Sequence, residues 1–199
     1  MQLLKKTKEI ERKAEEITPE LQHSLQVRRL ALLIFDILKG HHKLDEHSRF
    51  LLEGAALLHD VGLSVSVAGH NKISQRMIRD IDFKYVDKRE RNLIANISRY
   101  HTKSLPDPKH KTYSGLTEQE KDWVRKLSGI LRIADGLDRG HTSSVKDIRI
   151  KKQHGKMLFI IEGDVSDTDI YGFNKKKDLF EKEFGFSIGL IKESECQGL

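Results

Sequence analysis

Six residues with metal-ligand side chains fall on or beside predicted helices where their neighbours are apolar. His23 precedes Val27 by four residues and His101 follows Ile97 by four, a spacing that places each pair on one helix face. An ionisable side chain on a buried face is costly unless it is paired or binds a metal. Any one of the six taken alone could be a hydrogen-bonded core residue, but together they predict a shared site. The six are His23, His59, Asp60, His70, His101 and Asp135.

This ligand set consists of four imidazoles and two carboxylates, which favours one or two divalent ions chosen from Mn, Fe, Co, Ni and Zn, with Mg as a further candidate. Cys196 is the only cysteine, which excludes an intrachain disulfide framework and a zinc site built on thiolates. A carboxylate can bridge two ions, and Asp60 is the expected bridge. Two ions about 3.5 to 4 Å apart lower the pKa of a shared water and hold a phosphoryl oxygen.

The elements that must position these residues are mostly helices, because apolar residues recur at helical spacing up to about residue 141. Past Gly140 the apolar pattern alternates, which predicts a small α/β unit. The expected fold class is therefore mainly α, a helical bundle with a small C-terminal α/β subdomain. The expected parts are an N-terminal amphipathic helix at 1–17, a metal-binding helical domain at 18–141 and the α/β subdomain at 142–199.

Several element boundaries follow from local signals. Thr18 followed by Pro19 predicts the start of a helix that Gly40 ends. A largely apolar central helix is expected at 46–59. The remaining predictions are a short helix with Ile73, Met77 and Ile78, helices that open on the capping-box pairs Asp87 with Glu90 and Thr117 with Glu120, a hairpin over 145–161 with its turn at His154 and Gly155, a single helix at 169–184, and a strand at 186–190.

The order of the six ligands resembles the HD superfamily of metal-dependent phosphohydrolases, including the two extra histidines of its binuclear members. Longer segments resemble the C-terminal HD region of the exopolyphosphatase/guanosine pentaphosphatase (Ppx/GppA) family over roughly residues 18–191. The segments are HSLQV at 23–27, LLEGAALLHDVGLSVS at 51–66, GHNK at 69–72, RYHTKSLP at 99–106 and LRIADGLDRGH at 131–141.

The resemblance implies an HD helical bundle and a polyphosphate or nucleotide substrate. In that family the established phosphatase chemistry belongs to an actin-like module, which these 199 residues do not contain, so the activity is not inherited from the resemblance alone. The residues 61–64 after Asp60 lack the acidic pair expected of HD-type (p)ppGpp hydrolases. They also lack the lysine and the GYP signature of cyclic-di-GMP phosphodiesterases, so both substrates are disfavoured.

We expect His23, His59, Asp60 and Asp135 to hold one ion and Asp60, His70 and His101 to hold the other, with a bridging water as nucleophile. The histidine ligands must be neutral to bind a metal ion, and they begin to take up protons below about pH 6. Activity should therefore fall below that pH. Candidate cations for the phosphoryl charge are Lys72, Arg99, Lys103 and Arg139, each two to four residues from a ligand. For each of them a surface or helix-end charge is the alternative, and Arg139 could pair with Asp138.

The net charge of +6 and the pI near 9.3 are a modest surplus. They suit an anionic phosphate-containing small molecule or polyphosphate, and we do not expect nucleic acid. The lysines at 175–177 are interpreted as a solvated rim. The longest apolar run, 30–35, is too short for a membrane span, so we expect a cytoplasmic protein. An apolar seam of Leu3, Ile10 and Ile17 favours a homodimer.

Three functions are compatible with these patterns. The first is a metal-dependent phosphohydrolase that acts on a phosphoester or phosphoanhydride. The second is a non-catalytic regulatory module that binds polyphosphate or a nucleotide and docks on an enzyme through the seam of the first helix. The third is a diiron oxygenase, because the same ligand arrangement in the HD superfamily also supports inositol oxidation.

Overall fold

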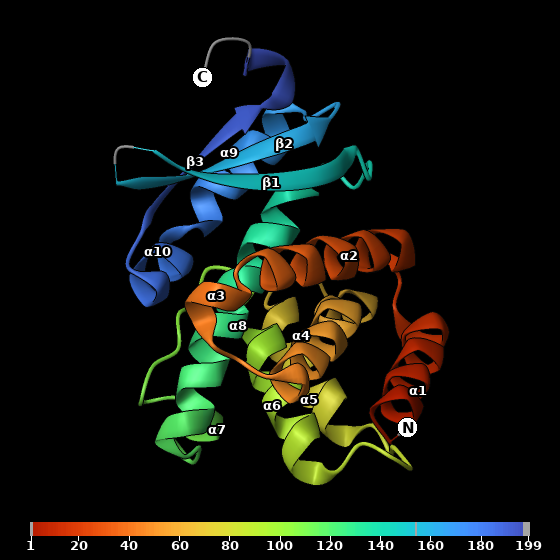
Figure 1. The fold of residues 1–199 in the computed structure, drawn as a ribbon. Helices are drawn as coiled ribbons and strands as arrows, with labels where there is room; N and C mark the ends of the chain where they lie inside the picture. The colour runs from red at the N-terminus through yellow and green to blue at the C-terminus, as the bar shows by residue number, and fades with distance from the viewer. Residues whose placement is uncertain (1, 154, 197–199) are drawn as a thin grey trace.

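The computed structural model describes residues 2–153 and 155–196, so His154 of the predicted hairpin turn lies outside the described residues. The fold is mainly α with a small C-terminal α/β part, which confirms the predicted class (Figure 1). The helical part consists of α1 (Gln2–Ile17), α2 (Leu21–Ile37), α3 (Lys39–His42), α4 (Glu46–Leu58), the 3₁₀ turn η1 (Val61–Ser64), α5 (His70–Asp80), α6 (Lys88–Arg99), α7 (Lys111–Ser114) and α8 (Glu118–Leu137).

Helix α4 lies at the centre of the helical part, as its apolar sequence predicts. Its N-terminus is capped by Asp45, whose side chain accepts a hydrogen bond from the Ser48 backbone N–H at 2.9 Å. Every residue from Phe50 to Leu58 is buried, because α1, α2, α6 and α8 all contact this helix. The end of α4 is therefore enclosed on most sides, which is the environment that a desolvated site requires.

Both predicted capping boxes are present. The Asp87 side chain accepts from the Glu90 N–H at 2.9 Å, and the Glu90 side chain accepts from the Asp87 N–H at 3.0 Å, which opens α6. The pair Thr117 and Glu120 makes the same reciprocal contacts at the start of α8. These two helices carry two of the six expected ligands, His101 and Asp135, at or near their C-terminal ends, so the caps fix where each of the two helices begins.

The predicted ends of the second helix are wrong. Helix α2 begins at Leu21 rather than after Thr18, whose hydroxyl instead donates to the Leu57 carbonyl at 3.4 Å. Gly40 does not end the helix, since α2 stops at Ile37 and Gly40 lies within the short helix α3. At Thr18 a tertiary contact replaces the expected N-cap, and at Gly40 a second short helix replaces the expected helix end.

The C-terminal part forms a three-stranded sheet backed by helices. Its elements are β1 (Val145–Gln153), β2 (Lys156–Gly163), α9 (Asp167–Lys176), α10 (Asp178–Phe184), β3 (Ser187–Lys192) and the short turn η2 (Glu193–Glu195). Strands β1 and β2 form the predicted antiparallel hairpin, and β3 pairs parallel to β2 after the chain crosses through the two helices. The rings of Phe159, Phe173 and Phe180 pack edge to face between the sheet and the helices.

The single helix predicted at 169–184 is two helices that meet at Lys177. The buried guanidinium of Arg132 on α8 explains the break, because its Nε donates to the Lys176 carbonyl at 3.0 Å and its Nη2 bonds to the Asp178 carboxylate at 2.6 Å. The Lys176 carbonyl is therefore held outside a regular helical ladder.

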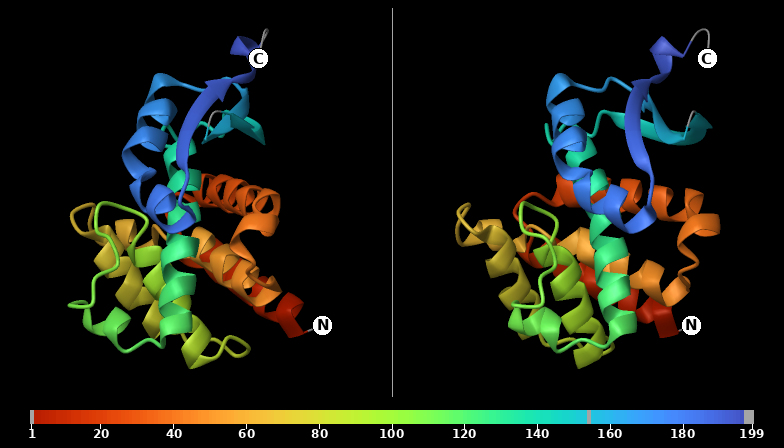
Figure 2. Two further views of the ribbon diagram at one scale, coloured as in Figure 1. Left: turned by 60° about the vertical axis from the view of Figure 1, so that its left-hand side comes forward. Right: turned by 90° about the vertical axis from the view of Figure 1, so that its left-hand side faces the viewer.

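Helix α8 joins the two parts, as Figures 1 and 2 show from three directions. Its backbone touches that of α9 at a pair of glycines. A Cβ on Gly136 would lie 2.8 Å from the Gly172 carbonyl carbon, and one on Gly172 would lie 2.3 Å from the Gly136 oxygen. Only glycine permits this approach, so the two helices are fixed closely against each other.

The apolar seam of α1 was expected to face a partner molecule, but part of it is covered by the protein itself. Ile10 is 1% exposed because its side chain packs on α4 at Gly54, close to Ile94, while Leu3 stays 38% exposed. The seam thus covers its own helical part, which removes this argument for docking on an enzyme or for a dimer, and the homodimer stays a prediction. None of the described helices is both long enough and apolar enough to span a bilayer.

Candidate metal centre

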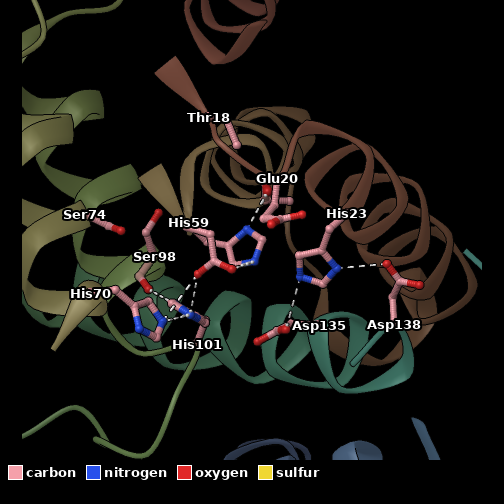
Figure 3. A network of polar contacts seen from close by, with 12 residues as sticks. Thr18, Glu20, His23, His59, His70, Ser74, Ser98, His101, Asp135 and Asp138 are labelled. Carbon is pink, nitrogen blue, oxygen red and sulfur yellow. Dashed lines mark hydrogen bonds and ion pairs between the residues drawn. The ribbon is translucent and has the colours of Figure 1, made fainter. Parts of the chain in front are cut away.

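The six predicted ligands converge at one end of α4, as Figure 3 shows for those it labels. Each comes from the element that the sequence suggests. His23 lies on α2, His59 caps α4 and is followed by Asp60, His70 begins α5, His101 follows α6, and Asp135 lies in the last turn of α8. All are buried except His70, whose side chain is 21% exposed.

Three of these residues, His23, His59 and Asp135, form one potential ligand group. Each offers a ligand atom within 4.8 Å of the others. The His23 Nε2 lies 3.5 Å from the Asp135 Oδ1. The sequence analysis expected Asp60 to belong to this group as well.

A second group consists of His59, Asp60 and His101, again with ligand atoms within 4.8 Å of one another. The Asp60 Oδ1 lies 3.2 Å from the His101 Nε2 and 3.4 Å from the His70 Nε2, and those two nitrogens are 3.1 Å apart. His59, rather than Asp60, belongs to both groups. The His59 Nε2 also lies 3.5 Å from the Asp60 Oδ2, so the Asp60 carboxylate lies between His59 and the pair His70 and His101, and its role as a bridge stays a prediction.

The imidazoles are oriented so that their Nε2 atoms face one another. Every Nδ1–H is taken up by an oxygen acceptor, which leaves the Nε2 lone pair free in the neutral ring, as in most protein metal sites. The Nδ1 acceptors are the Asp138 Oδ2 for His23 (2.8 Å), the Ala56 carbonyl for His59 (2.8 Å), the Val67 carbonyl for His70 (3.0 Å) and the Ser98 carbonyl for His101 (2.6 Å).

Several buried ligand atoms have no hydrogen-bond partner. They are the Nε2 atoms of His23 and His59 and the Oδ1 of Asp60. A buried polar atom without a partner costs about 1 to 3 kcal/mol, so such a cluster needs an explanation. A cation supplies one, because ligand bonds of about 2.1 Å place neighbouring ligand atoms about 3 to 3.5 Å apart, close to the separations seen here. The residues present thus fit a divalent ion.

Burial and neighbouring charges set the ionisation of the histidines. Burial lowers the pKa of His59 to about 4, so this ring is neutral at neutral pH. Burial also acts to lower the pKa of His23, but the carboxylates of Asp135 and Asp138 outweigh it and raise that pKa to about 9. His23 therefore carries a proton in the metal-free protein at neutral pH.

The two carboxylates remain ionised. Burial alone would raise their pKa values, but His59 and His101 lower the pKa of Asp60. The Lys176 ammonium beside Asp135 is the main cause that holds the pKa of Asp135 well below its usual range. Both side chains are therefore charged acceptors at neutral pH.

Three residues at the site were missed from the sequence. Asp138 accepts from His23 and lies three residues after Asp135, a spacing that places both on one helix face and could have revealed it. The ring of His141 stacks on that of His23, with centroids 3.8 Å apart. Lys176 bonds to the Oδ2 of Asp135, so the interpretation of the 175–177 lysines as a solvated rim is wrong for this residue.

The four predicted phosphate-binding cations differ in burial and in their partners, and their role stays a prediction. Arg99 is buried and donates to the Gln75 side chain at 3.2 Å, and the Arg139 guanidinium lies over the Tyr171 ring, with 5.6 Å from its central carbon to the ring centroid. Lys72 and Lys103 are exposed. The suggested pairing of Arg139 with Asp138 is replaced by the contact with Tyr171.

Comparison with protein-family models matches residues 6–182 to the Ppx/GppA phosphatase, domain III. The chain belongs to the Ppx/GppA phosphatase family. The match to this domain III covers most of the chain and includes all six predicted ligand residues, Asp138 and Lys176. No curated protein is detectably similar in sequence. Membership of the Ppx/GppA family relates the chain to phosphatases, and its His/Asp groups have the composition to bind metal.

Proposed function

We propose that this domain III is a metal-dependent phosphohydrolase of the HD type. Its substrate would be a phosphoester or phosphoanhydride in a nucleotide, a phosphorylated metabolite or polyphosphate. The observation that carries the proposal is the set of converging Nε2 atoms whose Nδ1 atoms are all engaged, together with the orphaned Asp60 Oδ1. Membership of a phosphatase family supports the same reaction class.

In this proposal His23, His59 and Asp135 hold one divalent ion, and Asp60, His70 and His101 hold a second, with His59 between the two groups. The chemistry that a bound ion supplies is a lowered pKa for coordinated water and polarisation of a phosphoryl oxygen. The protein contributes the fixed orientation of the rings, because four Nδ1 acceptors hold them. His70 is the most exposed of the six, at 21%, so we expect solvent and substrate to reach the centre beside it.

A substitution of Asp60 tests the proposal. Asp60→Ala removes a carboxylate whose Oδ1 lies within 3.4 Å of two imidazole nitrogens, so bound metal and turnover should fall together. Asp164→Ala is the control, because Asp164 is exposed in the loop between β2 and α9. Metal content is measured by elemental analysis, and turnover with a chromogenic phosphoester, nucleotides and polyphosphate in the presence of Mn, Co, Mg or Ni.

The wild type should hydrolyse a member of this panel in a metal-dependent way, and Asp164→Ala should behave like it. Full metal content in Asp60→Ala would contradict the ligand assignment. Metal binding and phosphate-compound binding without turnover by the wild type would favour the regulatory module over the hydrolase. An oxygen-dependent colour or spin signal would favour the diiron oxygenase.

A further inference from the structure

Lys176 enters the metal centre from the C-terminal part of the molecule. It is the last residue of α9, and its carbonyl is fixed by the Arg132 guanidinium at 3.0 Å. Its ammonium bonds to the Oδ2 of Asp135. The side chain is therefore anchored at its backbone and aimed at a residue of the ligand group.

The two oxygens of Asp135 have different neighbours. Oδ1 faces the His23 Nε2 at 3.5 Å, and Oδ2 faces Lys176. A buried carboxylate needs a counter-ion, and in the metal-free protein Lys176 supplies it. A divalent ion bound to Asp135 would compensate the same negative charge that Lys176 already compensates. The positive charge of the ion would also repel the ammonium.

The neighbouring lysines show that this placement is specific. Lys175 is exposed over the Tyr171 ring, and Lys177 donates to the Ile188 carbonyl at 3.0 Å. Of the three, only the Lys176 side chain reaches the centre, and it is 14% exposed against 9% for Asp135. The ammonium thus lies between the buried ligands and the solvent.

We propose that Lys176 binds the phosphoryl group of the substrate once a divalent ion has taken over the charge of Asp135; this rests on the proposed function. When the ion neutralises Asp135, the largely buried ammonium loses its carboxylate partner and needs another anion. A phosphate oxygen at the centre supplies that anion, and lysine suits it as a point charge on a flexible stem. The residue thereby makes the site selective for anionic phosphate compounds.

The proposal predicts two effects of opposite sign in Lys176→Met, which keeps the length of the stem and removes the charge. Without the competing ammonium, the metal-free variant should bind Mn²⁺ about tenfold more tightly than the wild type. The Mn²⁺-loaded variant should bind inorganic phosphate about tenfold more weakly, because the ammonium no longer contacts the anion. Both affinities are measured by isothermal titration calorimetry and need no turnover.

Lys175→Met is the matched control, since it removes a charge one residue away and should change neither affinity by more than about twofold. Lys176→Arg keeps the charge, so its phosphate affinity should stay within about threefold of the wild type. If Lys176→Met fails to fold by circular dichroism, Lys176→Gln takes its place in both titrations.

The outcomes separate the two proposals. Tighter Mn²⁺ binding together with weaker phosphate binding supports the role of Lys176. Phosphate binding by Lys176→Met equal to that of the wild type overturns it, and so does a loss of both affinities, which would make the pair purely structural. A wild type that binds Mn²⁺ and hydrolyses phosphate compounds would keep the proposed function in either case, whereas a wild type that binds none of Mn²⁺, Co²⁺, Mg²⁺ and Ni²⁺ overturns both.

Discussion

The carboxylate of Asp138 should control the metal affinity of the centre, because it holds a ligand rather than the ion. Asp138 is fully buried, its Oδ2 lies 2.8 Å from the His23 Nδ1, and its Oδ1 accepts from the Ser143 N–H at 2.7 Å. In Asp138→Asn the amide oxygen still accepts the hydrogen bond from the Ser143 N–H, so the end of α8 stays in place. The charge that orients His23 and raises its basicity is lost.

Loss of such an outer partner of a metal-bound imidazole typically weakens binding about 10- to 100-fold, or about 1.4 to 2.7 kcal/mol. The measurement is a Mn²⁺ titration of the metal-free protein in competition with a chelator. Asp36→Asn is the matched control, because Asp36 forms an exposed pair with Arg49 on the surface of α2. That variant should bind Mn²⁺ as the wild type does.

The same titration also measures the release of a proton from His23 when the ion binds. Because the pKa of His23 is raised to about 9, this ring is protonated in the metal-free protein at pH 7.5 and must release about one proton to bind an ion. His59, whose pKa is lowered to about 4, releases none. Proton competition at His23 thus begins near pH 9, well above the pH 6 expected from the sequence, and the apparent affinity falls as the pH is lowered from there.

Titrations in buffers of different ionisation enthalpy count the protons released. Asp138→Asn removes one of the three carboxylates that raise the pKa of His23, the others being Asp135 and Asp60, so the variant should release fewer protons than the wild type. Unchanged affinity and an unchanged proton count in Asp138→Asn would refute the reasoning, since His23 would then be held without its carboxylate.

Two further predictions concern stability. Gly62→Ala should lower the free energy of unfolding in urea by about 2 kcal/mol, because its methyl group would lie 2.3 Å from the His70 carbonyl oxygen. Gly40→Ala, whose methyl group meets nothing within 4 Å and which lies in the helix α3, should not lower it. Acid should destabilise the metal-free protein between pH 6.5 and 4, because the lowered pKa of His59 lets the unfolded chain take up a proton first. The loss is about 3 kcal/mol, because the pKa of His59 is about 4 in the folded protein and about 6.5 in the unfolded chain. His23 opposes this change little, because the stability that its raised pKa contributes is nearly complete once the pH is below 6.5. Melting curves that do not change between pH 6.5 and 4.5 would contradict the prediction.

The convergence of the six His and Asp residues could be predicted because its signal is local. His23 and His101 stand four residues from apolar neighbours, so helical periodicity alone places them on buried faces. The capping pairs of α6 and α8 are equally local and were found. The order of those helices along the chain then leaves one interior in which the ligands can meet.

The contacts that tune the site depend on tertiary structure. Lys175, Lys176 and Lys177 are chemically identical in the sequence, and only the capture of the Lys176 carbonyl by Arg132 directs one of them to Asp135. The same capture divides the predicted helix at 169–184 into α9 and α10. A side chain 44 residues away decides both results, which no local pattern can encode.

The central position of α8 bears on how the molecule is assembled. Its buried Arg132 bonds to the Tyr100 carbonyl on one side and to Lys176 and Asp178 on the other. A fragment that ended near residue 141 would leave this guanidinium without its partners from α9 and α10 and would uncover the glycine face of α8. The C-terminal part thus completes the packing around α8, and we expect such a fragment to be less stable than the full chain.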